Sequence, residues 1–258
     1  MSNTIRRFGL FGYPLSHSYS KKYFSEKFQR EGRSECVYEN FETQNIQDLK
    51  AIIRQHPDLE GLNVTIPFKQ EIIPMLDNLD EISQRIGAVN SVRIVRGEGG
   101  KAELHGYNTD AWGFELAIRP ILRPHHRRAL ILGTGGSAKA VSYVFRKLNI
   151  EHFFVTRNES RFHYTYADLN FNTMKAFQVI VNTTPLGMFP STDEYPKIPY
   201  EFLTHKNLCF DLIYNPPQTL FLAKAKEAGA FIHNGFRMLR LQAEKSWEIW
   251  NEPIFAQQ

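Results

Sequence analysis

One lysine in this sequence stands where a side chain could transfer a proton. Lys69 ends the run Asn63-Val64-Thr65-Ile66-Pro67-Phe68-Lys69. Pro67 cannot donate a hydrogen bond within a sheet, so it should end a strand and leave Lys69 in the first turn of a helix over residues 69–76. The helix dipole would there favour the neutral amine, which is the form that a general base needs. A solvated surface lysine is the simpler alternative.

The strand before Lys69 is predicted to have one polar and one apolar face. Side chains alternate across a strand, so Asn63 and Thr65 should share a face, while Val64 and Ile66 pack against a core on the other side. The sequence thus predicts a polar wall beside the lysine.

A second cluster has the spacing of a dinucleotide-binding loop. The apolar segment Ala129-Leu130-Ile131-Leu132 runs directly into Gly133-Thr134-Gly135-Gly136-Ser137-Ala138 and an alanine-containing helix. Gly133 would allow the tight turn, Gly135 the close approach of a pyrophosphate, and Ala138 the packing of helix on strand. The amino end of that helix, at Gly136 and Ser137, would face the anion. A turn with a purely structural role is the alternative.

The end of the following strand indicates which dinucleotide binds. Arg157, in Thr156-Arg157-Asn158, stands where an NAD-specific site usually has an acidic residue, and Arg161 follows. A carboxylate would repel a 2′-phosphate, whereas a guanidinium can bind it through charge-assisted hydrogen bonds. We therefore expect NADP(H), with two solvated arginines at a strand end as the alternative.

Further polar groups fall where predicted strands end or helices begin. Ser16-His17-Ser18 would open a helix and could bind a carboxylate, although an ordinary N-cap by Ser18 explains it equally well. Asn90 would begin a strand, where a turn-forming role is commoner. Asp110 could simply cap the next helix, and Gln242 lies early in the last helix, where a surface position is usual. Their joint occurrence beside a nucleotide fingerprint favours a single site.

Short apolar strands alternate with amphipathic helices, which indicates an α/β protein. Besides the strand that contains Asn63, strands are expected over 8–11, 37–41, 89–95, 102–105, 128–132, 153–156, 179–182, 208–212 and 231–233. Besides the helix over 69–76, helices are expected over 19–29, 46–55, 110–118, 138–148, 220–228 and 238–250. Glycines between residues 97 and 100 predict a hairpin, and therefore a mixed sheet, in the first half.

We expect two domains. Residues 1–109, joined by 238–258, would form a mixed-sheet substrate-binding and catalytic domain, and residues 110–237 a Rossmann-type domain with a parallel sheet for the nucleotide. Leu241, Trp247 and Trp250 lie on a face of the last helix that could return to the first domain.

Composition fits a soluble globular protein. The chain has 258 residues, of which 42% are hydrophobic and 22% charged, and no apolar run long enough to span a bilayer. Met1–Arg7 lacks the apolar stretch of a secretory signal. Cys36 and Cys209 show no metal-ligand spacing and are expected to be buried free thiols in a reducing cytoplasm.

The net charge of +4 suits an anionic small molecule as well as it suits nucleic acid. The His125-His126-Arg127-Arg128 cluster is expected to be a solvated turn and not a nucleic-acid patch. We therefore expect a small-molecule substrate, no nucleic acid, no membrane, and a monomer or homodimer.

Taken together, these features resemble the shikimate dehydrogenase family over nearly the whole chain. The resemblance rests on Ser16-His17-Ser18, residues 63–69, Gly87-Ala88-Val89-Asn90, Asn108-Thr109-Asp110, the glycine loop, Thr156-Arg157-Asn158, Asn182-Thr183-Thr184-Pro185-Leu186-Gly187-Met188, Asp211-Leu212-Ile213-Tyr214 and Gln242. It implies the NADP-dependent, reversible reduction of 3-dehydroshikimate to shikimate, a step towards chorismate and the aromatic amino acids. It also implies a substrate cleft between an N-terminal domain and a Rossmann domain.

The resemblance further implies a role for each site residue. Ser16, Ser18, Thr65 and Tyr214 would hold the substrate carboxylate. Lys69, Asn90, Asp110 and Gln242 would hold the ring hydroxyls, with Lys69 and Asp110 as the catalytic pair. The cofactor site would comprise Gly133, Gly135, Gly136, Ser137, Ala138, Thr156, Arg157, Arg161, Thr183 and Gly235.

Two segments depart from the family pattern. Between Ser160 and Ala176 the chain is shorter than the helix, strand and turn of its relatives, so a helix could be absent beside the adenosine site. Arg237 stands where many relatives have a small residue.

Three other functions remain open at this stage. A quinate/shikimate dehydrogenase would have the same fold, a broader substrate range and often NAD, which Arg157 disfavours. A non-catalytic NADP-binding sensor is disfavoured by the presence of both Lys69 and Asp110. A nucleic-acid-binding module is suggested only by the pI of about 9.0.

Overall fold

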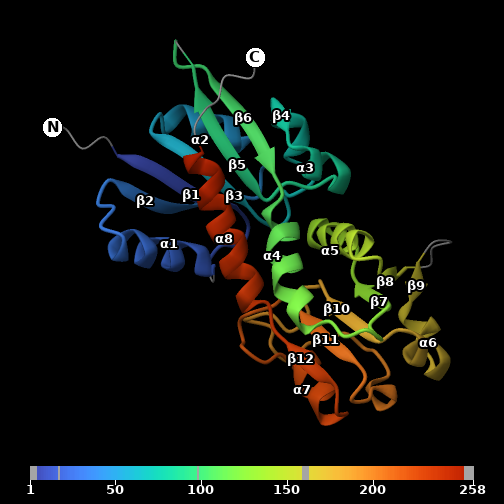
Figure 1. Ribbon diagram of the computed structural model, residues 1–258. Helices are drawn as coiled ribbons and strands as arrows, with labels where there is room; N and C mark the ends of the chain where they lie inside the picture. The colour runs from blue at the N-terminus through green and yellow to red at the C-terminus, as the bar shows by residue number, and fades with distance from the viewer. Residues whose placement is uncertain (1–4, 17, 98, 159–162, 253–258) are drawn as a thin grey trace. The chain divides into compact units, whose positions relative to one another are not determined.

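The computed structural model describes residues 5–16, 18–97, 99–158 and 163–252 (Figure 1). The chain divides into two compact units, each containing one six-stranded sheet. Unit 1 comprises the residues up to Thr109 and those from Ala243 onward, and unit 2 comprises Asp110–Gln242. The α/β class predicted from the alternating pattern is confirmed.

Unit 1 is built on a mixed sheet in the order β2-β1-β3-β5-β6-β4. Strand β1 is parallel to β2 and β3, whereas β5 is antiparallel to β3 and β6, so the predicted hairpin and mixed sheet are confirmed. The strands are β1 (Arg6–Gly12), β2 (Cys36–Glu42), β3 (Leu59–Val64), β4 (Asn78–Leu79), β5 (Ser91–Arg96) and β6 (Ala102–Tyr107). The helices are α1 (Tyr19–Arg30), α2 (Asp48–Gln55), the 3₁₀ turn η1 (Ile73–Met75), α3 (Glu81–Ile86) and the end of α8 (Phe236–Asn251).

Apolar side chains cover both faces of this sheet. On one face Phe8 stacks on Trp250 at 5.1 Å between ring centroids, and Phe24 of α1 stacks on Tyr38 at 4.5 Å. Trp247 and Trp250 therefore join the core of unit 1, as predicted for the last helix, while Leu241 belongs to unit 2. The other face packs on α2 and on the segment after β3. Burial of such large aromatic rings is a major stabilising contribution.

Unit 2 is built on a parallel sheet in the order β12-β11-β10-β7-β8-β9. This is the doubly wound Rossmann order, whose direction reverses between β7 and β10. The strands are β7 (Arg128–Leu132), β8 (Glu151–Thr156), β9 (Tyr164–Thr165), β10 (Val179–Asn182), β11 (Leu208–Asp211) and β12 (Phe231–His233). The helices are α4 (Thr109–Ile118), η2 (Arg119–Ile121), α5 (Gly136–Lys147), η3 (Tyr166–Asp168), α6 (Phe171–Ala176), η4 (Tyr200–Phe202), α7 (Leu220–Glu227) and the beginning of α8.

The helix predicted over residues 69–76 is wrong. Residues 66–72 form turns, and only the short η1 follows. Pro74 lies in the middle of the predicted span and has no N–H for an α-helical bond. Strand β3 also ends at Val64, so Ile66 is 54% exposed and does not pack in the core as expected. Helix α3 and strand β4 were not predicted.

A helix is present in the segment between β8 and β10, where the sequence suggested that one could be absent. Residues 159–162 lie outside the described part of the chain, which leaves β9, η3 and the six-residue α6. Among the described residues of this segment, no helix longer than α6 is present.

The turn before β7 is less solvated than predicted. His126 is only 4% exposed, and its Nδ1 accepts a hydrogen bond from the backbone N–H of Arg123. Its Nε2 lies 3.2 Å from the carbonyl oxygen of Lys206. Burial lowers the pKa of this imidazole, so the neutral form closes the turn.

Cys36 and Cys209 are both free and buried, which confirms the expectation for the two thiols. A search of the described residues for a helix with the length and apolar character needed to cross a bilayer gave none.

One glycine in the core of unit 1 provides a test of packing. A Cβ added to Gly61 would lie 2.5 Å from the indole of Trp250, whereas a Cβ added to Gly97 would meet no described atom within 4 Å. We expect Gly61→Ala to lower the free energy of unfolding by about 1–3 kcal/mol, the usual cost of overpacking. Gly97→Ala is the matched control in urea denaturation followed by tryptophan fluorescence. Equal stability of both variants would contradict this account of the core.

Candidate functional site

In unit 1, the predicted substrate ligands follow the carboxyl ends of β1 and β3. These strands are parallel, so the loops that follow them lie at the same edge of the sheet. The N–H of Tyr13 donates to the carbonyl of Ile66 at 2.9 Å and ties the two loops together. A Cβ on Gly12 would lie only 2.5 Å from Cγ2 of Thr65, so a glycine is required there. Thr65 itself is half-buried.

Ser18 caps helix α1, which was the structural alternative to substrate binding. Its hydroxyl oxygen accepts a hydrogen bond from the N–H of Ser20 at 3.3 Å. The Ser18 proton can still be donated, so capping does not prevent this hydroxyl from binding a carboxylate. Ser16 is exposed, and His17 lies outside the described residues.

Lys69 and Asn90 lie in neighbouring segments of unit 1. The N–H of Val89 donates to the carbonyl of Lys69 at 2.7 Å, which holds the two segments together. Lys69 is half-buried, but no helix begins there. The helix dipole therefore does not act on its amine, and that part of the sequence argument is wrong.

Asn90 was expected to begin a strand over 89–95, but β5 begins only at Ser91, so Asn90 lies directly before it and is only 2% exposed. Its Oδ1 accepts the backbone N–H of Thr109 at 2.6 Å, and its Nδ2 donates to the hydroxyl of Thr109 at 3.0 Å. The side chain therefore links β5 to the start of α4. An asparagine that only forms a turn would not need these long-range bonds.

Within unit 2, Asp110 and Gln242 come close to each other on neighbouring helices. Asp110 lies in the first turn of α4 and is 1% exposed, and the hydroxyl of Ser137 donates to its Oδ2 at 3.3 Å. A Cβ on Gly113 would lie 2.7 Å from the carbonyl of Met238 and 3.2 Å from Cβ of Gln242. Gly113 thus lets α8 approach α4 less than one turn away from Asp110. Gln242 is half-buried, not the surface residue that its position suggested.

The glycine loop has the geometry of an anion site. Gly133 has φ +106°, a conformation that favours glycine. A Cβ added to Gly135, the N-cap of α5, would meet no described atom within 4 Å. The first turn of α5 carries no acidic side chain among its described residues, and it begins with Gly136, Ser137 and Ala138. The N–H groups of a first helical turn and the positive end of the helix dipole fit a pyrophosphate.

Thr183 lies at the point where the strand order reverses. Both its N–H and its hydroxyl donate to the carbonyl of Leu132, at 3.0 and 2.6 Å. A Cβ on Gly133 would lie 2.9 Å from the Thr183 hydroxyl oxygen. Ligands of open α/β sheets bind in the crevice at such a reversal, between β7 and β10 in this chain.

The end of β8 carries a basic and not an acidic side chain. Arg157 is exposed, and the hydroxyl of Thr156 donates to the carbonyl of Asn158 at 2.5 Å. Arg161 lies outside the described residues. The described part of this strand end therefore fits a 2′-phosphate better than a free ribose hydroxyl.

Tyr214 follows the carboxyl end of β11, and Gly235 follows the carboxyl end of the parallel neighbour β12. The N–H of Gly235 donates to the carbonyl of Ile213 at 3.0 Å, and a Cβ on Gly235 would lie 1.9 Å from the carbonyl oxygen of Leu212. Only a glycine can lie this close to the carbonyl oxygen of Leu212. Tyr214 is half-buried.

A buried carboxyl group that sequence reasoning did not single out organises these loops. Asp211 is fully buried and accepts hydrogen bonds from Nδ2 of Asn182 at 3.1 Å, the hydroxyl of Thr219 at 2.6 Å and the N–H of Ile213 at 3.0 Å. It thereby ties together the loops after β10 and β11. The only available signal was its place in Asp211-Leu212-Ile213-Tyr214.

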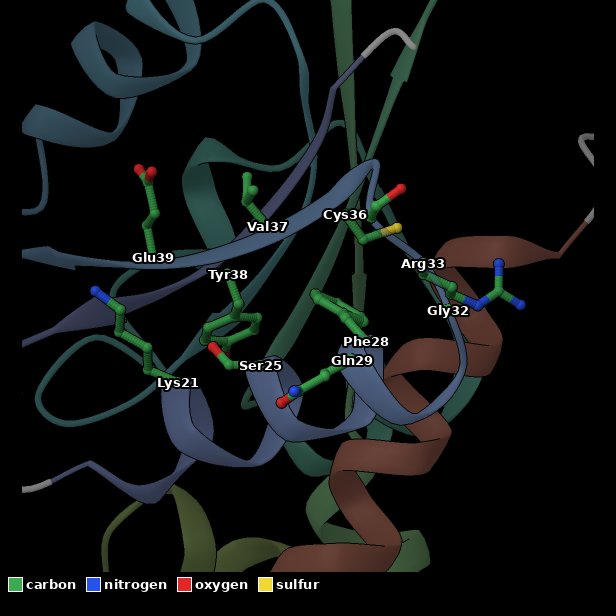
Figure 2. A pocket seen from close by; sticks show the side chains of 11 residues that line it. Lys21, Ser25, Phe28, Gln29, Gly32, Arg33, Cys36, Val37, Tyr38 and Glu39 are labelled. Carbon is green, nitrogen blue, oxygen red and sulfur yellow. The ribbon is translucent and has the colours of Figure 1, made fainter.

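A shallow groove on unit 1 lies apart from these residues. Figure 2 shows it between α1 and β2, the edge strand of the sheet, with Lys21, Phe28, Arg33 and Glu39 among its lining side chains. The described site residues of unit 1 do not line it.

The two units present complementary chemistry. Unit 1 gathers hydroxyl, amine and amide donors from Ser18, Thr65, Lys69 and Asn90, which suits an anionic and hydroxylated small molecule. In unit 2, the start of α5 could accept an anion, and the side chain of Asp110 is buried.

Comparison with known proteins identifies one family. Residues 10–92 match the family model described as the shikimate dehydrogenase substrate binding domain. The chain is 35% identical to the shikimate dehydrogenase (NADP(+)) of Methanococcus aeolicus, over 97% of this chain and 93% of that protein. It is 34% identical to the protein of the same name from Desulforamulus reducens, over 94% and 88% of the two chains.

A solved structure extends the likeness to three dimensions. The shikimate 5-dehydrogenase of Thermus thermophilus, in complex with NADP(H) and shikimate, has a TM-score of 0.82 and 29% sequence identity. The similarity covers 96% of this chain and 94% of that one.

Asp211 provides a test by pH. Burial raises the pKa of its carboxyl group to about 7, against the opposing effect of its three hydrogen bonds. The folded state therefore holds a proton that the unfolded chain releases, and this group's contribution to stability is lost as the pH rises from about 4 to 7. Asp211→Asn mimics the protonated form at every pH. Both proteins are compared by urea denaturation. Between pH 5 and pH 8, the free energy of unfolding of the variant should rise by on the order of 2 kcal/mol relative to that of the wild type.

A difference between the two proteins that stays constant over this pH range would contradict the assignment of a buried, protonated carboxyl group at Asp211.

Proposed function

This chain belongs to the shikimate dehydrogenase family, and we propose that it catalyses the NADP-dependent, reversible reduction of 3-dehydroshikimate to shikimate. The observation that carries the proposal is a glycine loop at the reversal point of the parallel sheet of unit 2, in a chain that also carries Lys69 and Asp110. The product would be used to make chorismate and the aromatic amino acids.

Unit 2 provides the cofactor site in this proposal. Gly133 allows the tight turn, Gly135 leaves room for the pyrophosphate at the start of α5, and Arg157 binds the 2′-phosphate. Thr183 and Gly235 line the loops at the nicotinamide end. When bound, NADP(H) supplies or accepts the hydride.

Unit 1 provides most of the substrate site. Ser16, Ser18 and Thr65, together with Tyr214 of unit 2, hold the carboxylate through hydroxyl donors. Asn90 and Gln242 bind ring hydroxyls and fix which carbon receives the hydride.

Lys69 and Asp110 carry the proton chemistry. Reduction of the ketone creates an alkoxide that must be protonated, and the reverse reaction needs a base for the same hydroxyl. Lys69 serves both directions, while Asp110 orients the amine and accepts a hydrogen bond from the hydroxyl. The proposal requires that both groups reach the same substrate oxygen.

We further propose that the protein works in the cytoplasm as a monomer or homodimer and binds no nucleic acid. Its two buried, free cysteines are consistent with a reducing compartment.

Replacing Lys69 tests the proposed mechanism. Lys69→Ala should lower kcat for shikimate oxidation by roughly 100- to 10,000-fold, the usual contribution of a general acid or base, with NADP affinity unchanged. Lys69→Arg keeps the positive charge but cannot release its proton, so it should remain about as slow. Steady-state absorbance of the reduced nicotinamide measures both variants.

Lys21→Ala, on the exposed face of α1, is the control for loss of a lysine from unit 1. Near-normal turnover by Lys69→Ala, or full activity of Lys69→Arg, would remove Lys69 from proton transfer.

Replacing Arg157 tests the choice of cofactor. Arg157→Ala should raise KM for NADP by roughly 10- to 100-fold, because a charge-assisted hydrogen bond to phosphate is lost, and should leave KM for NAD nearly unchanged. Arg127→Ala removes the same charge from the exposed turn at the amino end of β7, away from the cofactor loops, and should change neither value. Parallel losses with both cofactors would contradict a 2′-phosphate contact.

A further inference from the structure

A chain of buried and partly buried hydrogen bonds runs through unit 1 and ends at Asn90. It contains side chains from β2, β3, α8, the start of α4 and the residue before β5. In order they are Tyr38, Asn63, Ser246, Thr109 and Asn90. Four of them are almost inaccessible to solvent: Tyr38 is 3% exposed, Ser246 0%, Thr109 1% and Asn90 2%. Most buried polar groups in proteins are hydrogen-bonded, and each of these is.

The direction of the first bonds follows from Tyr38. Burial raises the pKa of its phenol, so it stays protonated and donates to Oδ1 of Asn63 at 2.9 Å. This fixes the orientation of the Asn63 amide, whose Nδ2 then donates to the hydroxyl oxygen of Ser246 at 2.8 Å. Since Ser246 accepts from Asn63, its own proton is available for the oxygen of Thr109, at 3.3 Å.

Thr109 in turn orients the side-chain amide of Asn90 through hydrogen bonds. Its N–H donates to Oδ1 of Asn90 at 2.6 Å, and its hydroxyl lies 3.0 Å from Nδ2 and 3.2 Å from Oδ1 of the same amide. The Asn90 oxygen is thus held towards the backbone of Thr109. An amide held in this way keeps one Nδ2 hydrogen in a defined direction.

The contact between Thr109 and Ser246 also lies where the chain passes between units. The chain leaves unit 1 after Thr109 and returns to it between Gln242 and Ala243, one helical turn before Ser246. A single pair of hydroxyl groups therefore ties together, within unit 1, the two segments by which the chain leaves and returns. Asp110 follows Thr109 directly in sequence.

We propose that Ser246 is a positioning residue for the substrate: its hydroxyl orients Thr109, and through Thr109 the amide of Asn90. The inference rests on the proposed function, in which Asn90 binds a ring hydroxyl. Ser246 touches neither substrate nor cofactor in this account. It acts by restricting Asn90 to the rotamer that can donate to the substrate.

The test compares two serines that are equally buried. Ser246 and Ser91 are both 0% exposed and both belong to unit 1, but Oγ of Ser91 has no hydrogen-bond partner among the described residues. Ser246→Ala and Ser91→Ala therefore remove the same atom from similar surroundings. Only the first interrupts the chain of hydrogen bonds.

We expect Ser246→Ala to raise KM for shikimate roughly 3- to 10-fold, the effect of about one hydrogen bond. The value of kcat should change little, because Asn90 would bind the hydroxyl equally in the ground and transition states. KM for NADP should stay within about twofold of the wild type, and Ser91→Ala should match the wild type in all three values. Equal KM values for shikimate in the two serine variants would overturn the proposal.

Thr109 supplies an independent check of the path. Thr109→Val should raise KM for shikimate as Ser246→Ala does, and Thr109→Ser, which keeps the hydroxyl, should restore most of the affinity. The double variant Ser246→Ala/Thr109→Val should be no worse than Thr109→Val alone, since both changes interrupt one path. If the increases in KM for shikimate caused by the two substitutions multiply in the double variant, Ser246 does not act through Thr109.

A readout without substrate separates this inference from the proposed function. Amide hydrogen exchange of Thr109 should be faster in Ser246→Ala than in Ser91→Ala, because its bond to Asn90 is less well held. If the wild type does not oxidise shikimate, the proposed function is wrong. The hydrogen-exchange comparison then still tests whether Ser246 orders Thr109, because it needs no substrate. Unchanged exchange at Thr109 would overturn the inference even in an active enzyme.

Discussion

Parallel pairing of strands determines where the candidate site lies in each unit. Parallel neighbours end at the same edge of a sheet, so the segments that follow them are brought together although they are far apart in sequence. In unit 1 this applies to β1 and β3, which lead to Ser18 and Thr65. In unit 2 it applies to β7, β8, β10 and β11. The glycine loop, Arg157, Thr183 and Tyr214 all follow from that pairing.

Close backbone contacts then determine which residue types these loops can contain. Gly12 meets Thr65, Gly113 of α4 meets the carbonyl of Met238, and Gly235 meets Leu212 at distances that no Cβ could occupy. Buried polar side chains complete the arrangement, with Asp211 joining the loops of unit 2 and Ser246 joining Asn63 to Thr109 in unit 1. These contacts cost desolvation and are stable only because each group is hydrogen-bonded. Their function in this account is to hold donors in place before the substrate arrives.

The sequence predicted most of the fold because apolar periodicity is a local property. Strands such as β7, β10 and β12 were predicted with their observed bounds, and the hairpin of β5 and β6 followed from its glycines. The helix predicted at Lys69 failed because Pro74 interrupts it and turns replace it. Ile66 was wrongly predicted to face the core. Side chains alternate between the two faces of a strand only as far as the strand is paired, and the pairing of β3 ends at Val64.

The site was predictable only in part, for a physical reason. A glycine loop or a basic residue after a strand has a local spacing that a sequence displays. Hydrogen bonds such as those between Asp211 and Thr219, or between Ser246 and Thr109, join residues whose separation in the sequence follows no known motif. A serine in the middle of a helix likewise gives no indication in the sequence of its hydrogen-bond partner. The capping role of Ser18 was foreseen, whereas the buried bonds of Asn90 required the fold.

The most direct measurement is the steady-state kcat/KM of the purified protein for the four combinations of shikimate or quinate with NADP or NAD. The account predicts the highest value for shikimate with NADP, and a clear loss when either partner is exchanged. Absence of nicotinamide reduction with shikimate and NADP would contradict it, as would a preference for quinate with NAD.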